Sequence, residues 1–162
     1  MKDAKFTLEF VSHCLANGRS QDRNCDTFDR DSEGRLIWNY VWWYSALQKA
    51  VDGAKLSSPK PAQVNVCLTV EAPVSIYKRK IKENWFRRHE AIDPGTRVTF
   101  AAVVDDVVTE SSLRTLLDWV GKYVGISPYG YNLGFGRFNV IEVVVDSGVR
   151  QVVHDSSPAV GS

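Results

Sequence analysis

The apolar residues of this chain follow two different periods, and the order in which these periods alternate constrains the fold. Apolar and polar residues alternate, as in half-buried strands, over residues 5–15, 64–70, 97–104 and 138–145. Apolar residues spaced by three and four, as on one face of a helix, occupy residues 36–51 and the segment that Thr109 opens. The sequence therefore predicts strands and helices in the order β-α-β-β-α-β.

This order predicts an α+β protein with the ferredoxin-like arrangement, in which an antiparallel four-stranded sheet carries both helices on one face. The chain has 162 residues, which suits one domain with a core of its own. We expect residues 1–155 to form that domain and residues 156–162 to form a disordered tail. We also expect a short additional strand over residues 149–153.

The first helix and the segment before it carry further expectations. Residues 17–35 are polar and mixed in charge, which indicates a long surface loop. Gly53 is the expected end of the first helix. The core-facing stripe of that helix is expected to consist of Trp38, Val41, Trp42, Leu47 and Ala50.

Charge and cysteine content limit the classes of function. The formal net charge is +1, so attraction to nucleic acid has to come from a local patch. Cys14, Cys25 and Cys67 lack the spacing of a zinc site, so we expect reduced thiols, no metal and no cofactor. A Cys14–Cys25 bridge is the alternative. Neither an export signal nor an apolar run of about 18 residues occurs, which predicts a protein of the bacterial or phage-infected cytoplasm without membrane contact.

Basic and aromatic residues interleave between the second and third predicted strands. Cations neutralise phosphates and aromatic rings stack on unpaired bases, so this combination indicates contact with RNA or single-stranded DNA. The alternative is a solvated hairpin whose long side chains cover apolar surface. The expected nucleic-acid contacts in this segment are Lys78, Arg79, Lys80, Lys82, Trp85, Phe86, Arg87 and Arg88.

Glycines are dense between the second helix and the last predicted strand. Glycine permits positive φ and close approach to the main chain, whose N–H groups can hold a phosphate. We therefore add Gly134, Gly136 and Arg137 to the expected nucleic-acid contacts. The alternative is a bulge that serves only the fold.

Large aromatic rings crowd one short segment around the start of the first helix. They are too many for a single buried stripe, so we expect some of them to contact a protein partner or a second copy of the chain. An ordinary core is the alternative. The expected interface consists of Trp38, Tyr40, Trp42, Trp43 and Tyr44.

His89 and His13 are the candidates for catalysis. Histidine titrates near neutral pH and suits the acid and base roles of a metal-independent endoribonuclease. Neither histidine has an evident acid–base partner in the sequence, so enzymatic activity is the least favoured hypothesis.

Two segments resemble the RAMP superfamily, ferredoxin-like proteins that build CRISPR effector backbones and process guide RNA. Residues 28–37, followed by Ser45-Ala46-Leu47, resemble the family's lead into its first helix. Residues 134–138, with the sequence Gly-Phe-Gly-Arg-Phe, resemble its glycine-rich loop. The chain differs at residues 38–43, where the family has a Pro-Gly-Ser-Ser-type segment. In length it is similar to small stand-alone members found in phage and prophage genomes.

The basic and aromatic segment and the glycine-rich segment together favour a non-enzymatic protein that binds RNA or single-stranded DNA. The alternative is a viral or phage module that mimics or engages a CRISPR or other defence complex. Such a module would contact protein partners of that complex or form a homo-oligomer.

Overall fold

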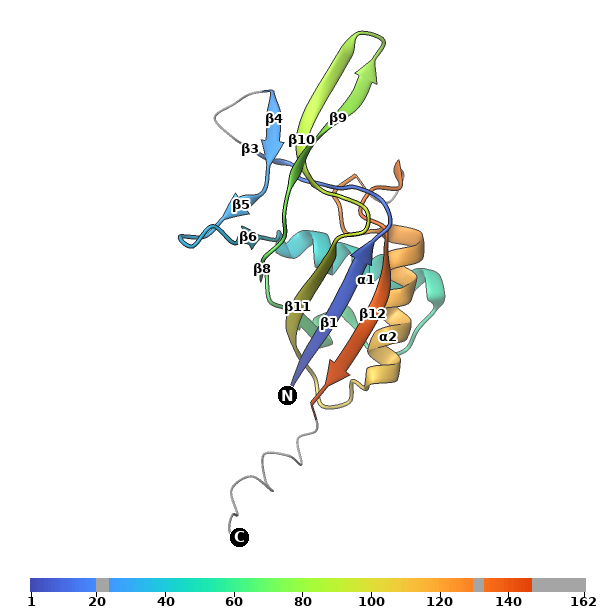
Figure 1. The fold of residues 1–162 in the computed structure, drawn as a ribbon. Helices are drawn as coiled ribbons and strands as arrows, with labels where there is room; N and C mark the ends of the chain where they lie inside the picture. The colour runs from blue at the N-terminus through green and yellow to red at the C-terminus, as the bar shows by residue number, and fades with distance from the viewer. Residues whose placement is uncertain (20–23, 130–132, 147–162) are drawn as a thin grey trace.

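The computed structural model describes residues 1–19, 24–129 and 133–146 (Figure 1). Its main sheet is antiparallel, with the strand order β12-β1-β11-β7. The strands are β1 (Lys2–Phe10), β7 (Val64–Val66), β11 (Arg97–Val104) and β12 (Phe138–Val145). Two helices, α1 (Tyr40–Ala54) and α2 (Glu110–Trp119), lie on one side of this sheet (Figure 1). The predicted α+β ferredoxin-like fold is therefore confirmed.

Alternation along the strands explains why only one face of the sheet is covered. In β11, Val98, Phe100, Ala102 and Val104 are buried, whereas the residues between them are exposed. The register places Phe6 of β1 opposite Phe100, so the buried faces of the two central strands coincide. The helices cover this face, and none of the described helices covers the opposite face of the sheet.

Two smaller sheets extend the molecule beyond the four-stranded sheet. The first has the order β2-β10-β4-β3, with β9 paired to β10, and the second has the order β5-β6-β8. Their longest strands form a hairpin that projects from one end of the main sheet (Figure 1). The bounds are β2 (Cys14–Leu15), β3 (Gly18–Arg19), β4 (Cys25–Thr27), β5 (Asp29–Arg30), β6 (Leu36–Ile37), β8 (Thr69–Val70), β9 (Ser75–Lys82) and β10 (Trp85–Ile92).

The predicted surface loop over residues 17–35 is wrong in part, because this segment contributes β3, β4 and β5. The first predicted strand also divides into β1 and β2, and the second into β7 and β8. The short strands have only two or three residues each and cannot show an alternating pattern; they are β2, β3, β4, β5, β7 and β8. They form because distant segments supply main-chain partners, as β10 does for β4.

The expected additional strand over residues 149–153 and the expected tail over residues 156–162 lie outside the described residues.

Helix α1 begins later and ends later than predicted. The side chain of Asn39 accepts a hydrogen bond of 2.8 Å from the Val41 N–H and caps the helix. The helix continues through Gly53 to Ala54, and Lys55 then takes a φ of 55°. The buried face consists of Trp43, Ala46, Leu47 and Ala50. Val41 is 64% exposed, so the predicted stripe was rotated: Trp43, not Val41, faces the core.

Helix α2 begins where the sequence predicts, because Thr109 and Ser112 form a reciprocal capping box. It continues as a π turn, η2 (Val120–Val124), in which the Gly125 N–H donates to the Val120 carbonyl at 2.7 Å. A side chain at Gly121 would meet the Phe138 carbonyl, so glycine lets this turn lie against β12. A short 3₁₀ turn, η1 (Pro61–Gln63), precedes β7.

The three cysteines are not joined in disulfides, so the alternative bridge between Cys14 and Cys25 is absent. Both of these residues are buried, whereas Cys67 is exposed. Burial raises the pKa of the Cys14 thiol well above its usual value.

Phe100 lies at the centre of an aromatic core. Its ring packs at 5.1 Å from Trp43, 5.5 Å from Trp38 and 5.7 Å from Phe6, measured between ring centroids. These rings come from the strand–helix interface and from the segment before α1. Trp38 is fully buried although it precedes the helix.

We expect Phe100→Ala to lower the free energy of unfolding by about 3–5 kcal/mol, because it leaves a cavity between three rings. Val103→Ala on the open face of the same strand should cost about 1 kcal/mol or less, since Val103 is already 39% exposed. Urea denaturation followed by circular dichroism measures both changes. Equal losses would contradict the central role of Phe100.

Candidate nucleic-acid interface

The β9–β10 hairpin has two chemically different faces. Side chains alternate along both strands, and the register pairs residues that share a face. Arg79 lies opposite Arg87 and Tyr77 lies opposite His89, which defines the inner face. On the outer face, Lys78 lies opposite Arg88 and Lys80 lies opposite Phe86. The predicted contacts are therefore divided between two surfaces.

His89 is fully buried on the inner face. The Arg79 Nε–H donates to its Nε2 at 3.1 Å, so the ring proton lies on Nδ1, which donates to the Ala16 carbonyl at 2.7 Å. Burial lowers the pKa of His89 below its ordinary value, and the positive charges of Arg79 and Arg87 act in the same direction. The imidazole is therefore held neutral, with both nitrogens engaged.

Asp26 lies beside His89, because β4 and β10 pair in parallel at this point. Its carboxylate forms an ion pair with Arg87 and lies 3.4 Å from the His89 Nδ1. The hydrogen bond from Arg87 to this carboxylate raises the pKa of the arginine. Arg79 and Arg87, both predicted to contact phosphates, are thus engaged by groups of the inner face.

The glycine-rich segment between η2 and β12 packs onto this inner face. We call this segment, residues 125–137, the glycine loop; its residues 125–129 and 133–137 are described. The Tyr129 ring lies 4.5 Å from the Arg79 guanidinium carbon and 5.0 Å from the His89 ring. Burial raises the pKa of the Tyr129 hydroxyl. The Phe135 ring meets the Tyr77 ring edge-on at 5.5 Å. The two regions that the sequence marked separately are therefore parts of one structure.

Main-chain N–H groups of the glycine loop donate hydrogen bonds to other parts of the protein. Gly134 and Gly136 have φ values of 80° and 72°, which favour glycine. The Gly136 N–H donates to the His13 carbonyl at 2.8 Å, and the Arg137 N–H donates to the Ser12 Oγ at 2.9 Å. The Arg137 guanidinium donates to the Lys122 carbonyl at 2.7 Å. This geometry favours a structural role for the loop over phosphate binding by its N–H groups.

The outer face and the tip of the hairpin present the remaining predicted contacts to solvent. Trp85 is 55% exposed and Phe86 is 50% exposed. The Lys82 Nζ lies 6.0 Å from the Trp85 ring centroid, and Lys80 pairs loosely with Glu83 at 3.8 Å. Lys78 is exposed on the same hairpin, and Arg88 is half-buried. Cations and flat apolar rings are therefore adjacent on a projecting surface.

The aromatic segment at the first helix is divided between the core and the surface. Trp38 and Trp43 are buried, so only part of the predicted interface is accessible. Tyr40 and Tyr44 are 49% and 41% exposed, and their rings stack at 5.8 Å. Trp42 is half-buried. The surface that could meet a partner is thus reduced to the two tyrosines and the edge of Trp42.

The other candidate histidine, His13, is half-buried beside Asp93. Its Nε2 lies 3.7 Å from the Asp93 Oδ1, and the Ser75 Oγ lies 2.5 Å from the same oxygen. A nucleophilic serine requires the histidine between the hydroxyl and the carboxylate. Here the carboxylate lies between the serine and the histidine. Together with the burial of His89, this arrangement does not favour catalysis by either histidine.

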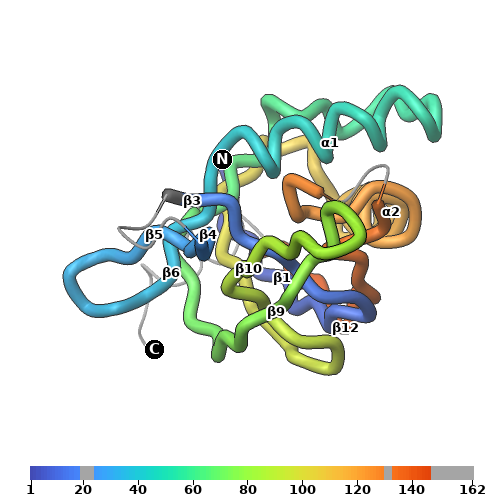
Figure 2. The backbone as a smooth tube through the Cα atoms, turned by 90° about the horizontal axis from the view of Figure 1, so that it is seen from above, coloured from blue at the N-terminus to red at the C-terminus, as the bar shows by residue number. Residues whose placement is uncertain are grey.

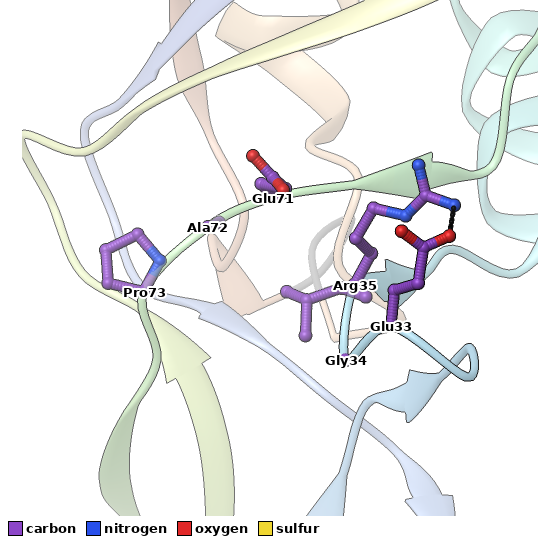
Figure 3. A pocket seen from close by; sticks show the side chains of 7 residues that line it. Glu33, Gly34, Arg35, Glu71, Ala72 and Pro73 are labelled. Atoms are coloured by element: carbon purple, nitrogen blue, oxygen red, sulfur yellow. Dashed lines mark hydrogen bonds and ion pairs between the residues drawn. The ribbon is translucent and has the colours of Figure 1, made fainter.

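A surface pocket of about 380 Å³ lies away from the predicted contacts (Figure 3). Arg35 lies beside Glu33, with the two charged groups 3.2 Å apart, and it also pairs with Asp31 at 2.8 Å. Glu71 lines the pocket from the opposite segment (Figure 3). The acidic groups raise the pKa of Arg35, chiefly through its hydrogen bond to Asp31. Carboxylates thus outnumber the single cation there.

Sequence reasoning missed Asp26 and Tyr129, although both organise the inner face. Asp26 lies in a polar segment without a period, and Tyr129 lies in a loop; no local signal connects either residue to His89. Among the described residues, no group of three or more His, Cys, Asp or Glu side chains could hold a metal ion. Within the same residues, no helix has both the length and the apolarity needed to cross a membrane.

We expect acid to destabilise the protein through His89. The pKa of His89 is lower in the folded protein than its ordinary value of 6.5, so below pH 6.5 the unfolded chain binds the proton more readily. The contribution of His89 is therefore complete above pH 6.5 and is lost as the pH falls through the lower folded-state pKa. Urea midpoints measured across this range should fall more steeply for the wild type than for His89→Gln. Parallel curves would contradict the neutral buried imidazole.

One solved structure with a similar fold is a chain described as "Type IV-B CRISPR Complex". The superposition has a TM-score of 0.51 and covers 90% of this chain and 91% of that chain. Sequence identity is 11%, so the similarity concerns the fold. No protein-family model matches the chain. The comparison with curated proteins found no match.

Proposed function

We propose that the protein binds single-stranded nucleic acid without cleaving it, as a RAMP-type component of a CRISPR-like nucleoprotein complex. The observation that carries this proposal is the exposed basic and aromatic surface of the β9–β10 hairpin. We call the exposed residues of this hairpin that carry the proposal the hairpin surface; they are Lys78, Lys80, Lys82, Trp85 and Phe86.

The chemistry of the hairpin surface suits an unpaired strand better than a duplex. Exposed lysines attract phosphates at any base sequence, while a tryptophan or phenylalanine ring stacks on a splayed base. Lys82 lies beside the Trp85 ring, so a stacked base and its phosphate could be bound together. Since the net charge of the chain is only +1, the attraction is local to this surface.

The inner face supports this function without contacting the ligand. Arg79, Arg87 and His89 attach the hairpin to β4 and to the glycine loop. A projecting hairpin of two strands is marginal alone, so these contacts hold its outer side chains in place. The fold shared with a chain of a CRISPR complex is compatible with a nucleoprotein role and supports the proposal by analogy.

A second candidate function is a protein-interaction module that engages a CRISPR or other defence complex. The stacked and exposed pair Tyr40–Tyr44 favours it, because tyrosine is common at the centre of protein interfaces. Sedimentation separates the two functions. Self-association or partner binding that is abolished by Tyr40→Ser, together with no affinity for oligonucleotides, would favour the module.

We expect Lys78→Gln/Lys82→Gln to weaken binding of labelled oligouridylate and oligothymidylate and to reduce its salt dependence. For each phosphate that is no longer neutralised, the slope of log affinity against log salt should become shallower by about 0.7. The matched control is Lys5→Gln/Lys60→Gln, which removes the same charge from exposed positions outside the hairpin. Fluorescence anisotropy at several salt concentrations measures both. Equal slopes in the two variants would exclude the hairpin surface as the phosphate-binding region.

Trp85→Ala should weaken binding by about 1–3 kcal/mol, because one base loses its stacking platform. Ile76→Ala is the control, since Ile76 is an apolar residue of the same hairpin and is 58% exposed. Anisotropy at a single low salt concentration is sufficient. The stacking role is rejected if the two variants bind alike.

A further inference from the structure

We propose that the bound strand continues from the hairpin across the glycine loop to a second stacking site at Tyr123. This inference rests on the proposed function and extends it by a second contact region. It would lengthen the footprint of the protein on nucleic acid beyond what the hairpin alone can cover.

The second site is built on the π turn that ends α2. The Tyr123 side chain is 46% exposed, and its ring lies 4.6 Å from the Trp119 ring. The Lys122 Nζ lies 5.3 Å from the Tyr123 ring centroid. An exposed ring beside an exposed lysine repeats the arrangement of Trp85 and Lys82 on the hairpin. Such a pair can stack one base and attract its phosphate.

The packing of the turn on α1 and β12 holds Trp119 and Tyr123 in position. A side chain added to Gly53 of α1 would overlap the Trp119 ring, so Trp119 packs directly on the helix backbone there. Gly121 allows the same turn to lie against β12. Tyr123 therefore packs against Trp119, whose position is fixed by α1 and by the turn itself. The Tyr123 side chain would then lose little conformational entropy when a base stacks on it. A π turn at a functional position is a recurrent feature of α-helices.

The glycine loop connects the two sites. At one end the Tyr129 ring lies on Arg79 of the hairpin, and at the other the Arg137 guanidinium donates to the Lys122 carbonyl. Figures 1 and 2 show that the hairpin rises from the end of the molecule at which α2 terminates, with the described parts of the glycine loop, residues 125–129 and 133–137, between them. A strand that leaves the tip of the hairpin, at Lys82 and Trp85, and runs towards the end of α2 would pass beside this loop and approach the turn that carries Tyr123.

Charges of both signs lie near Tyr123, and removing the negative one tests which kind of ligand binds there. Asp118 is exposed on the turn that precedes Lys122, and its carboxylate would repel a phosphate. Removing that charge should therefore not weaken binding, whereas removing the ring should. A site for an acidic ligand and a site for a basic protein segment respond to Asp118→Asn in opposite directions.

The test compares two lengths of labelled oligouridylate, about 6 and about 16 nucleotides, which span the footprints of single-strand-binding surfaces. We expect Tyr123→Ala to bind the longer oligomer about tenfold more weakly and the shorter one unchanged. Tyr123→Phe, which keeps the ring, should bind like the wild type, and Asp118→Asn should bind equally or more tightly. Ultraviolet cross-linking of the longer complex should label the peptide that contains Tyr123.

The outcomes separate this inference from the proposed function. If Tyr123→Ala binds the longer oligomer like the wild type while Trp85→Ala does not, the second site is overturned and the hairpin surface stands. If Tyr123→Ala weakens both lengths equally, the residue acts on the fold and the extended track is also overturned. If no oligomer binds, or Trp85→Ala changes nothing, the proposed function itself fails.

Discussion

The contact on which the rest of the site depends is the packing of Arg79 between His89 and Tyr129. A buried imidazole needs a partner for each nitrogen, and these come from β9 and from the segment after β2. While Arg79 donates to His89, its guanidinium carbon lies over the Tyr129 ring of the glycine loop. One arginine thereby ties the hairpin to a loop residue that lies 50 positions further along the chain.

This contact also separates the cations of the hairpin by position. Arg79 and Arg87 face inward and are engaged by His89 and Asp26, whereas the lysines of the hairpin surface remain in solvent. Arginine suits the inner role because its planar group can stack and donate at once. Lysine suits the outer role that we propose, since a flexible point charge can follow a nucleic-acid backbone. The charge available to the proposed ligand is thus smaller than the sequence suggests, but it lies on a positioned surface.

The long periodic elements could be predicted from the sequence, and the short pairings could not. The predicted bounds of β11 and β12 match the structure, as does Thr109 as the start of α2, because alternation and capping are local signals. Strands β3, β4 and β5 carry no such signal, and they exist through partners that are distant in the chain. The rotation of the α1 stripe was missed for a related reason: Trp38 is core although it lies outside the helix. Asp26 and Tyr129 join the site only through that distant pairing.

By itself, the sequence determined the fold class and the basic, aromatic character of the hairpin. Hydrophobic period and residue type are properties of neighbours in the chain, so they survive without coordinates. Only the tertiary structure decided which cations face solvent, that the glycine loop packs on the hairpin, and that Lys122 and Tyr123 lie exposed beside the half-buried Trp119. These facts depend on strand register and on contacts between remote segments, and a shift of one residue would exchange the two faces of the hairpin.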